Sequence, residues 1–284
     1  MEGTLAILGA GRMGEALLSG LLRSGWAQPD QVRCTVRTPS RAGRLARDYK
    51  VRADIDSPAA AAEADVLLLA PKPQNLETML EQIAPKVHAG QTVISVVAGV
   101  STAVIEEALA GGVPVVRVMS NVPVQVDEAM SVVAPGRFAG PEHLAIAEGL
   151  LSHVGRVVHL AEEHLDAVTA LSGSGPAYFA LIAESMIDAG ILLGLSRDVA
   201  TELIVQTMVG TAKMLRDTGR HPVEIRESVT SPGGTTIAAI RVLEQERVRA
   251  AFLNAIEAAK LRSEQLGALA ERRRASITPP LRTQ

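Results

Sequence analysis

The chain has 284 residues, a net charge of −3 and a pI near 6.1, which give no reason to expect nucleic acid or an anionic membrane as a partner. This length favours two domains, and 47% hydrophobic residues provide for a sizeable core although only 2% are aromatic. Cys34 is the only cysteine, which excludes an internal disulfide. Because no targeting segment or membrane-length apolar run is visible, we expect a cytoplasmic globular protein.

Short apolar runs alternate with helical patterns in the first half of the chain. The predicted strands are 4–8, 32–36, 66–70, 92–96, 115–119, 131–134 and 157–160. The predicted helices between them are 15–24, 40–49, 74–83, 102–110 and 141–153. Near-continuous apolar strands that alternate with helices predict a doubly wound, mostly parallel sheet covered on both faces.

Strand signals are absent after about residue 161, where helices are predicted at 177–193, 198–215, 235–245 and 247–266. The first of these helices is apolar nearly all round, and one small helical domain can hardly bury such a helix alone. We therefore expect a homodimer. The predicted α/β organisation is a Rossmann-like domain at 1–161, an all-α dimerisation and substrate domain at 162–270 and a flexible tail at 271–284.

A glycine-rich loop follows the first predicted strand and opens the first helix. In this Gly-x-Gly-x-x-Gly pattern, Gly9 permits a tight turn, Gly11 lets backbone amides approach a pyrophosphate, and Gly14 lets the helix pack closely. Arg12 and Met13 belong to the same expected cofactor site. A plain strand-to-helix turn is less consistent with this context.

The end of the second strand indicates which dinucleotide binds. An NAD site usually has a carboxylate there, whereas this chain has Arg37, Thr38, Ser40 and Arg41, which suit a 2′-phosphate. We expect NADPH, with NADH as a weaker cofactor; a solvated loop with incidental arginines is the competing interpretation. Loops after later strands add further expected cofactor contacts at Ala70, Pro71, Lys72, Pro73, Ala98, Gly99, Asn121 and Pro123. Lys72 can equally be read as a surface lysine.

A second glycine-rich stretch lies at 230–236, before the predicted helix 235–245. Its paired glycines and hydroxyls predict an anion site at a helix N-terminus, suited to a substrate carboxylate, although an ordinary capping turn has the same composition. The expected substrate-binding residues are Ser231, Gly233, Gly234, Thr235 and Thr236.

These motifs together resemble those of the pyrroline-5-carboxylate reductase family. The resemblance extends to about residue 266 and rests on GAGRMGEAL at 9–17, PKP at 71–73, AGVS at 98–101, LSGSGPAY at 171–178 and VTSPGGTTIAAIRVLE at 229–244. It implies a Rossmann domain, a helical domain that dimerises, often within larger rings such as a decamer, and reduction of 1-pyrroline-5-carboxylate to L-proline. The chain departs from the family pattern at Ser120, Val122 and Ala129, which places the catalytic efficiency or the preferred substrate in question.

The resemblance places Thr236 near the imine nitrogen as the expected catalytic residue, where orientation suits a hydroxyl better than acid catalysis. No residue cluster has the spacing of a metal site, and capping or surface roles are expected for His164 and His221. A β-hydroxyacid dehydrogenase would need a lysine on the early helices of the second domain, and none lies between 161 and 211. The sequence does not exclude a reductase of a six-membered imine or a catalytically silent dinucleotide sensor.

Overall fold

The structure is a computed structural model that describes residues 3–109 and 111–277, with side chains as far as 268. The chain divides into two compact units. Unit 1 comprises Met1–Ser174 and Ala259–Gln284, and unit 2 comprises Gly175–Ala258.

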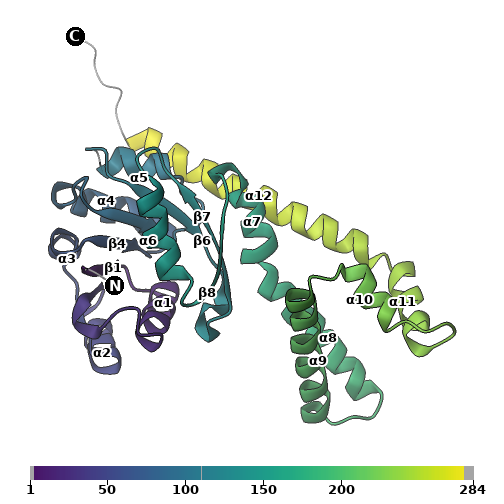
Figure 1. Cartoon of the computed structure of the whole chain (residues 1–284). Helices are drawn as coiled ribbons and strands as arrows, with labels where there is room; N and C mark the ends of the chain where they lie inside the picture. Colours follow the sequence, from purple (N-terminus) through teal and green to yellow (C-terminus); the bar gives the residue numbers. More distant parts are fainter. Residues whose placement is uncertain (1–2, 110, 278–284) are drawn as a thin grey trace. The chain divides into compact units, whose positions relative to one another are not determined.

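Unit 1 is built on an eight-stranded sheet with the strand order β3-β2-β1-β4-β5-β6-β7-β8 (Figure 1). The strands are β1 Leu5–Leu8, β2 Val32–Thr35, β3 Arg52–Asp54, β4 Val66–Leu69, β5 Thr92–Ser95, β6 Val115–Met119, β7 Ala129–Pro135 and β8 Gly155–His159. All neighbouring pairs are parallel except β6 and β7. This confirms the predicted doubly wound sheet, whose first six strands have the order typical of dinucleotide-binding folds.

Helices cover both faces of this sheet, because its strands carry apolar side chains on both sides (Figure 1). In β1, Leu5 and Ile7 belong to one core cluster, while Ala6 and Leu8 belong to another. The first cluster includes residues of α1 Arg12–Arg23, α2 Pro39–Tyr49 and α6 Pro141–Leu151. The second includes residues of α3 Ser57–Glu63, α4 Leu76–Ile83 and α5 Thr102–Leu109.

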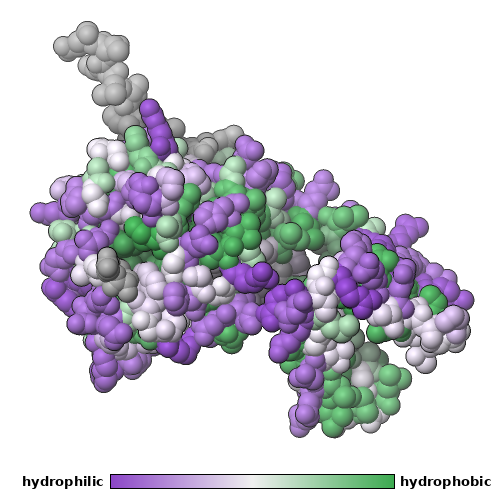
Figure 2. All heavy atoms as spheres, in the orientation of Figure 1, coloured by the Kyte–Doolittle hydropathy of each residue, from purple (hydrophilic) through white to green (hydrophobic). Residues whose placement is uncertain are grey.

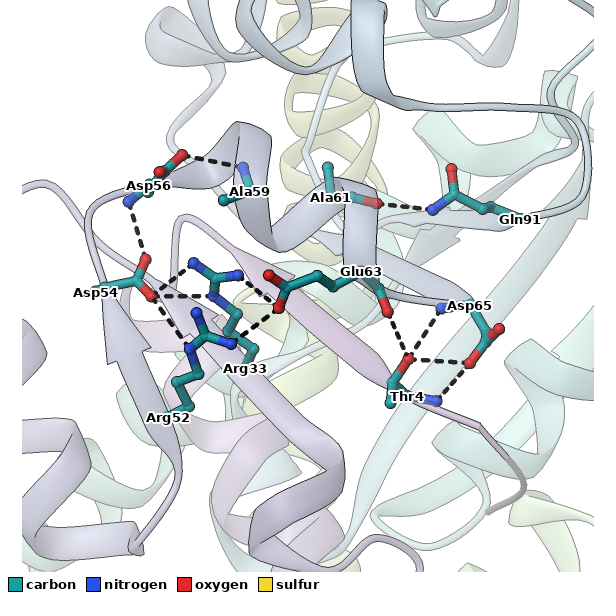
Figure 3. Close-up of polar contacts among 10 residues, drawn as sticks. All are labelled: Thr4, Arg33, Arg52, Asp54, Asp56, Ala59, Ala61, Glu63, Asp65 and Gln91. Atoms are coloured by element: carbon teal, nitrogen blue, oxygen red, sulfur yellow. Dashed lines mark hydrogen bonds and ion pairs between the residues drawn. The ribbon is translucent and has the colours of Figure 1, made fainter.

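A polar network fastens two elements, β3 and α3, that the sequence patterns did not predict (Figure 3). The side chain of Arg33 is only 10% exposed, and its guanidinium lies 2.8 Å from carboxylate oxygens of both Asp54 and Glu63. Arg52 binds the same Glu63 oxygen at 2.9 Å. Asp56 caps α3 by accepting a hydrogen bond from the amide of Ala59 at 3.0 Å. These polar contacts add to the pairing of β3 with β2 and to the burial of Ala60 and Ala61 of α3 in the core.

Unit 2 is entirely helical, as expected for this part of the chain. Its helices are α8 Gly175–Leu192, α9 Arg197–Thr218, α10 Pro222–Ser228, α11 Thr235–Gln245 and the first part of α12 Val248–Ile277. The short helix α10 was not predicted; the imidazole Nδ1 of His221 caps it by accepting from the amide of Val223. The capping or surface role expected of His221 is thus confirmed.

The last helix belongs to both units by sequence, because its residues from Ala259 onward belong to unit 1. It continues past the predicted end at 266 and past 271, where a flexible tail was predicted, as far as Ile277. In unit 1 the Ser263 hydroxyl donates to the carboxylate of Asp166 at 2.6 Å, which fastens the helix to α7 Leu165–Val168. The remaining part of the predicted tail, 278–284, lies outside the described residues.

Candidate functional site

The glycine-rich loop lies between the carboxyl end of β1 and the start of α1. Gly9 has φ +77, and a Cβ there would lie 2.9 Å from backbone atoms of Pro71. At Gly14, a Cβ would lie 3.1 Å from Ala70 Cβ and 3.2 Å from Ile7 Cγ2, so a glycine lets α1 approach the sheet closely. The positive φ of Gly9 suits the tight turn expected there, and the contacts of Gly14 suit the close helix packing expected there; the approach of Gly9 to Pro71 is an additional finding.

The start of α1 offers backbone donors to an anion. Gly11 is the N-cap residue of α1 and makes no side-chain capping bond. A Cβ on Gly11 would meet no atom closer than 3.7 Å, which leaves room beside these amides. Unpaired amides at a helix N-terminus suit a pyrophosphate, so the residues present fit the diphosphate of a dinucleotide.

The two arginines that follow β2 have different surroundings. The side chain of Arg41 donates to the Ala10 carbonyl at 3.0 and 3.1 Å and pairs with the Glu15 carboxylate at 2.8 Å. Arg37 is exposed and has no hydrogen bond or ion pair among the described residues. The sequence pattern treats the two alike, whereas in the structure Arg41 joins α2 to the glycine loop and Arg37 remains free for a ligand.

A further arginine, Arg44, was not identified from the sequence, because its partner is distant along the chain. Its guanidinium lies 2.6 Å from the Glu15 carboxylate. The hydrogen bond from Arg44 is the largest influence that lowers the pKa of Glu15 below its ordinary value. Arg41 and Arg44 thus neutralise the one carboxylate in the first turn of α1, which would otherwise repel a phosphate.

The start of α2 lies directly after Arg37. Thr38 is the N-cap residue and makes no side-chain capping bond, and its hydroxyl lies 3.4 Å from that of Ser40. Both residues are exposed. One guanidinium, two hydroxyls and uncapped backbone amides are thus brought together here, and this set suits a phosphate.

Three more loops follow β4, β5 and β6, as predicted. After β4, Pro71 packs against Gly9, while Lys72 and Pro73 are exposed. After β5, Ala98 is exposed and Gly99 has φ +73. The glycine loop and these loops all leave the carboxyl ends of parallel strands that neighbour one another, the edge at which such sheets bind ligands.

The loop after β6 is different, because the side chain of Asn121 is used within the protein. Its amide nitrogen donates to the Ser172 carbonyl at 3.2 Å, and its amide oxygen accepts from the Met130 amide at 2.9 Å. A Cβ at Gly173 would collide with the end of the Met119 side chain. The segment Thr169–Gly173, a π-helical turn, therefore packs on the carboxyl end of β6, and Asn121 fastens it there. Pro123 follows in the short helix Val122–Val126.

The second glycine-rich site lies in unit 2, between α10 and α11. Gly233 has φ +68, and the Gly234 amide donates to the Ser231 carbonyl at 3.1 Å, closing a turn. Gly234 is the N-cap of α11 and provides no side-chain cap. The hydroxyls of Ser231, Thr235 and Thr236 have no hydrogen-bond partner among the described residues. The turn thus offers uncapped amides and unengaged hydroxyls to an anion.

Other reactive side chains do not form a site in the described part of the chain. No group of three or more His, Cys, Asp or Glu side chains in it is arranged to hold a metal ion. Cys34 is buried in β2, and burial raises the pKa of its thiol to about 12. His164 is exposed at the surface, in keeping with the role expected of it.

Two family models and several full-length relatives match this chain. Residues 162–266 match the family model for pyrroline-5-carboxylate reductase dimerisation, and residues 4–99 match that for NADP oxidoreductase, coenzyme F420-dependent. A pyrroline-5-carboxylate reductase of Corynebacterium melassecola is 44% identical, over 93% of this chain and 98% of its own. That of Methanosarcina acetivorans is 41% identical, over 93% of this chain and 97% of its own.

Solved structures show the same similarity. A pyrroline-5-carboxylate reductase from Coxiella burnetii superposes with a TM-score of 0.87 at 32% identity, covering 94% of this chain and 99% of that one. A Plasmodium falciparum pyrroline carboxylate reductase with NADP bound gives a TM-score of 0.85 at 26% identity, covering 94% and 98%.

Proposed function

This chain belongs to the pyrroline-5-carboxylate reductase family, and on that premise we propose that it reduces 1-pyrroline-5-carboxylate to L-proline with NADPH. This is the last step of proline biosynthesis. The observation that carries the proposal is the turn before α11, which retains the sequence VTSPGGTT and has unengaged hydroxyls and uncapped amides. A carboxylate is the feature of this substrate that such a turn recognises.

The proposed cofactor site includes Gly9, Gly11, Arg12, Met13 and Gly14. When bound, NADPH supplies the hydride for the reaction. The amides at the start of α1 hold its diphosphate. Arg37, with Thr38, Ser40 and the start of α2, holds its 2′-phosphate. Because this region provides a guanidinium and no free carboxylate at the end of β2, NADPH is favoured over NADH.

The remaining cofactor contacts come from the loops after the next strands. Residues of the loops at 70–73 and 98–99 line the nicotinamide, with Pro71 fixed against Gly9. Asn121 contributes by holding the segment at 169–173 in place through Ser172, since both ends of its amide are engaged. Pro123 follows on the same loop. A solved relative carries NADP, which supports this cofactor.

Substrate binding is assigned to the turn before α11. Ser231, Gly233, Gly234 and Thr235 hold the carboxylate through backbone amides and hydroxyls. The Thr236 hydroxyl accepts a hydrogen bond from the protonated imine nitrogen and orients the ring. The imine arrives protonated, so the protein need not supply a strong acid, and positioning the imine carbon for hydride transfer is its main task.

The test compares two cyclic imines and two variants of Thr236. The wild type should oxidise NADPH faster with 1-pyrroline-5-carboxylate than with the six-membered 1-piperideine-6-carboxylate. Thr236→Ala should lower kcat by about tenfold or more, while Thr236→Ser should keep most of it and neither should change NADPH affinity. Tight NADPH binding without turnover of either imine would leave a dinucleotide sensor as the better account. An unchanged rate in Thr236→Ala would remove Thr236 from the mechanism.

A homodimer is proposed as the basic assembly, formed through unit 2. Large apolar side chains are exposed on α8 and α9, among them Phe179 at 62%, Leu181 at 63% and Leu192 at 88% (Figure 2). No described helix is long and apolar enough to cross a membrane. Burying this surface against a second copy accounts for its composition. By resemblance to the family, dimers then join into a larger ring such as a decamer, and light scattering measures both steps.

The proposed location is the cytoplasm, where a single free thiol and reduction by NADPH both suit the reducing conditions.

A further inference from the structure

The loop between β5 and α5, residues 96–101, is fastened at its far end by a carboxylate distant in sequence. Oε1 of Glu162 accepts the Thr102 amide at 2.8 Å, and Oε2 accepts the Thr102 hydroxyl at 2.6 Å. Glu162 therefore holds the first residue of α5 by two hydrogen bonds. A carboxylate at that position is also favoured by the positive end of the helix dipole.

The same carboxylate reaches the near end of the loop through an arginine. Nη1 of Arg117, on β6, lies 3.0 Å from Oε1 of Glu162. Arg117 is paired in register with Ser95, the last residue of β5 before the loop. The Arg117 side chain is 12% exposed and that of Glu162 is 25% exposed, so solvent screens this ion pair only partly. The pair thus joins the two ends of one loop.

The middle of the loop is also confined. Gly99 has φ +73, and a Cβ there would lie 3.7 Å from the Gly267 amide and 3.9 Å from atoms of Leu266, both in the part of α12 that belongs to unit 1. Val97 and Val100 are buried, while Ala98 is exposed. With its ends joined and its tip against a helix, the loop has little freedom and presents Ala98 outward.

We propose that Glu162 is a positioning residue for hydride transfer: with Arg117 and Thr102 it holds the loop at 98–101 where the nicotinamide ring of the cofactor rests. This inference rests on the proposed function, which assigns Ala98 and Gly99 to the nicotinamide. The adenosine half is held by other elements, α1 and α2, so Glu162 acts on one half of the cofactor only. A displacement of about 1 Å at the reacting carbon is enough to slow transfer about 100-fold.

The test uses variants that each change a single group in the contacts of Glu162 with Thr102 and Arg117. Glu162→Gln removes the charge that Arg117 faces, and Thr102→Val removes only the hydroxyl that Glu162 binds, whereas Thr102→Ser keeps it. The control is Glu63→Gln, which breaks another contact to a largely buried arginine in unit 1, Arg33, away from the proposed cofactor loops (Figure 3).

Two probes separate the halves of the cofactor. NADPH is titrated by the fluorescence of its reduced nicotinamide, and 2′,5′-ADP, which lacks the nicotinamide, is titrated by competition. In Glu162→Gln and Thr102→Val, kcat should fall at least about tenfold and the nicotinamide emission should change, with the Kd of 2′,5′-ADP unaltered. Thr102→Ser should resemble the wild type, and Glu63→Gln should keep its cofactor affinity and kcat even if it unfolds more easily.

Equal losses for NADPH and 2′,5′-ADP would overturn the proposal, because they indicate general destabilisation. So would unchanged kcat and emission in folded Thr102→Val, the variant that serves if Glu162→Gln fails to fold. Failure of the proposed function is distinguishable, since the wild type would then reduce neither imine. In that case the emission and 2′,5′-ADP titrations still decide whether Glu162 places the nicotinamide.

Discussion

Substituting Gly9 by alanine tests whether the close approach of the glycine loop to Pro71 is required. The variant is compared with Gly25→Ala, because Gly25 has nearly the same φ, +74 against +77, but no atom within 4 Å of its notional Cβ. Both variants share the cost of a left-handed alanine, about 1–2 kcal/mol, and the gain from a stiffer unfolded chain, about 0.4–1 kcal/mol. These contributions cancel when the two variants are compared.

What remains is the contact with Pro71. At Gly9 an added Cβ would lie 2.9 Å from Pro71 Cα and N, which are backbone atoms that cannot rotate away. Overpacking of this kind typically costs about 1–3 kcal/mol. Gly9→Ala should therefore have a free energy of unfolding lower than that of Gly25→Ala by about 1–3 kcal/mol. It should also bind NADPH more weakly, because the loop must shift to accept the methyl group.

The assay is urea unfolding followed by tryptophan fluorescence. Trp26 is the only tryptophan of the chain, lies in unit 1 and packs against its larger core cluster, so its emission reports on that unit. NADPH affinity is measured in parallel by fluorescence titration. Equal free energies of unfolding for the two variants, with equal cofactor affinity, would refute the argument that Gly9 is required by its contact with Pro71.

Three further predictions follow from single residues. Arg37→Gln should raise the KM for NADPH about tenfold or more and leave the KM for NADH within about twofold. Arg41→Gln should weaken the binding of both cofactors, because Arg41 pairs with Glu15. Equal effects of Arg37→Gln on both cofactors would contradict the assignment of Arg37 to the 2′-phosphate. The pKa of Glu15 is lower in the folded protein than its ordinary value of 4.5. The ionised carboxylate therefore stabilises the folded state fully above pH 4.5, and this stabilisation is lost as the pH falls through the lower pKa of the folded state. In Glu15→Gln the urea concentration at the midpoint of unfolding should therefore fall less steeply as the pH is lowered. The same dependence on pH as in the wild type would contradict this role of Glu15. With a thiol pKa near 12, Cys34 should resist iodoacetamide at pH 8 until urea unfolds the protein, and rapid labelling of the native protein would contradict its burial.

The main architecture could be predicted from the sequence, because apolar strands and amphipathic helices have distinct periods. The structure confirms strands close to the seven predicted ranges, with ends that differ by a few residues. It adds β3, which has only three residues and is held by polar contacts of Arg33 and Arg52, and α3, which is rich in alanine. Neither has an apolar pattern, although the Asp-Ser-Pro sequence at 56–58 is a helix-start signal that points to α3.

The candidate site was only partly predictable, for a different reason. Glycine loops can be recognised from local spacing, and the loops at 9–14 and 231–236 lie where the sequence placed them, each running into the start of a helix. Contacts between distant residues leave no such signal. Arg117 and Glu162 are 45 positions apart, and Asn121 and Ser172 are 51 apart. For the same reason, the sequence could not separate Arg41, which the protein engages, from Arg37, which it leaves free.

The proposed reduction of the imine by NADPH is tested most directly by following the transferred hydrogen into the product. The wild-type protein is incubated with 1-pyrroline-5-carboxylate and NADPH deuterated at the reactive carbon of its nicotinamide, and the product is examined by NMR and mass spectrometry. The expected product is L-proline with one deuterium at the former imine carbon, in amounts equal to the NADPH oxidised. Oxidation of NADPH without labelled proline, or no reaction at all, would contradict the proposed reduction.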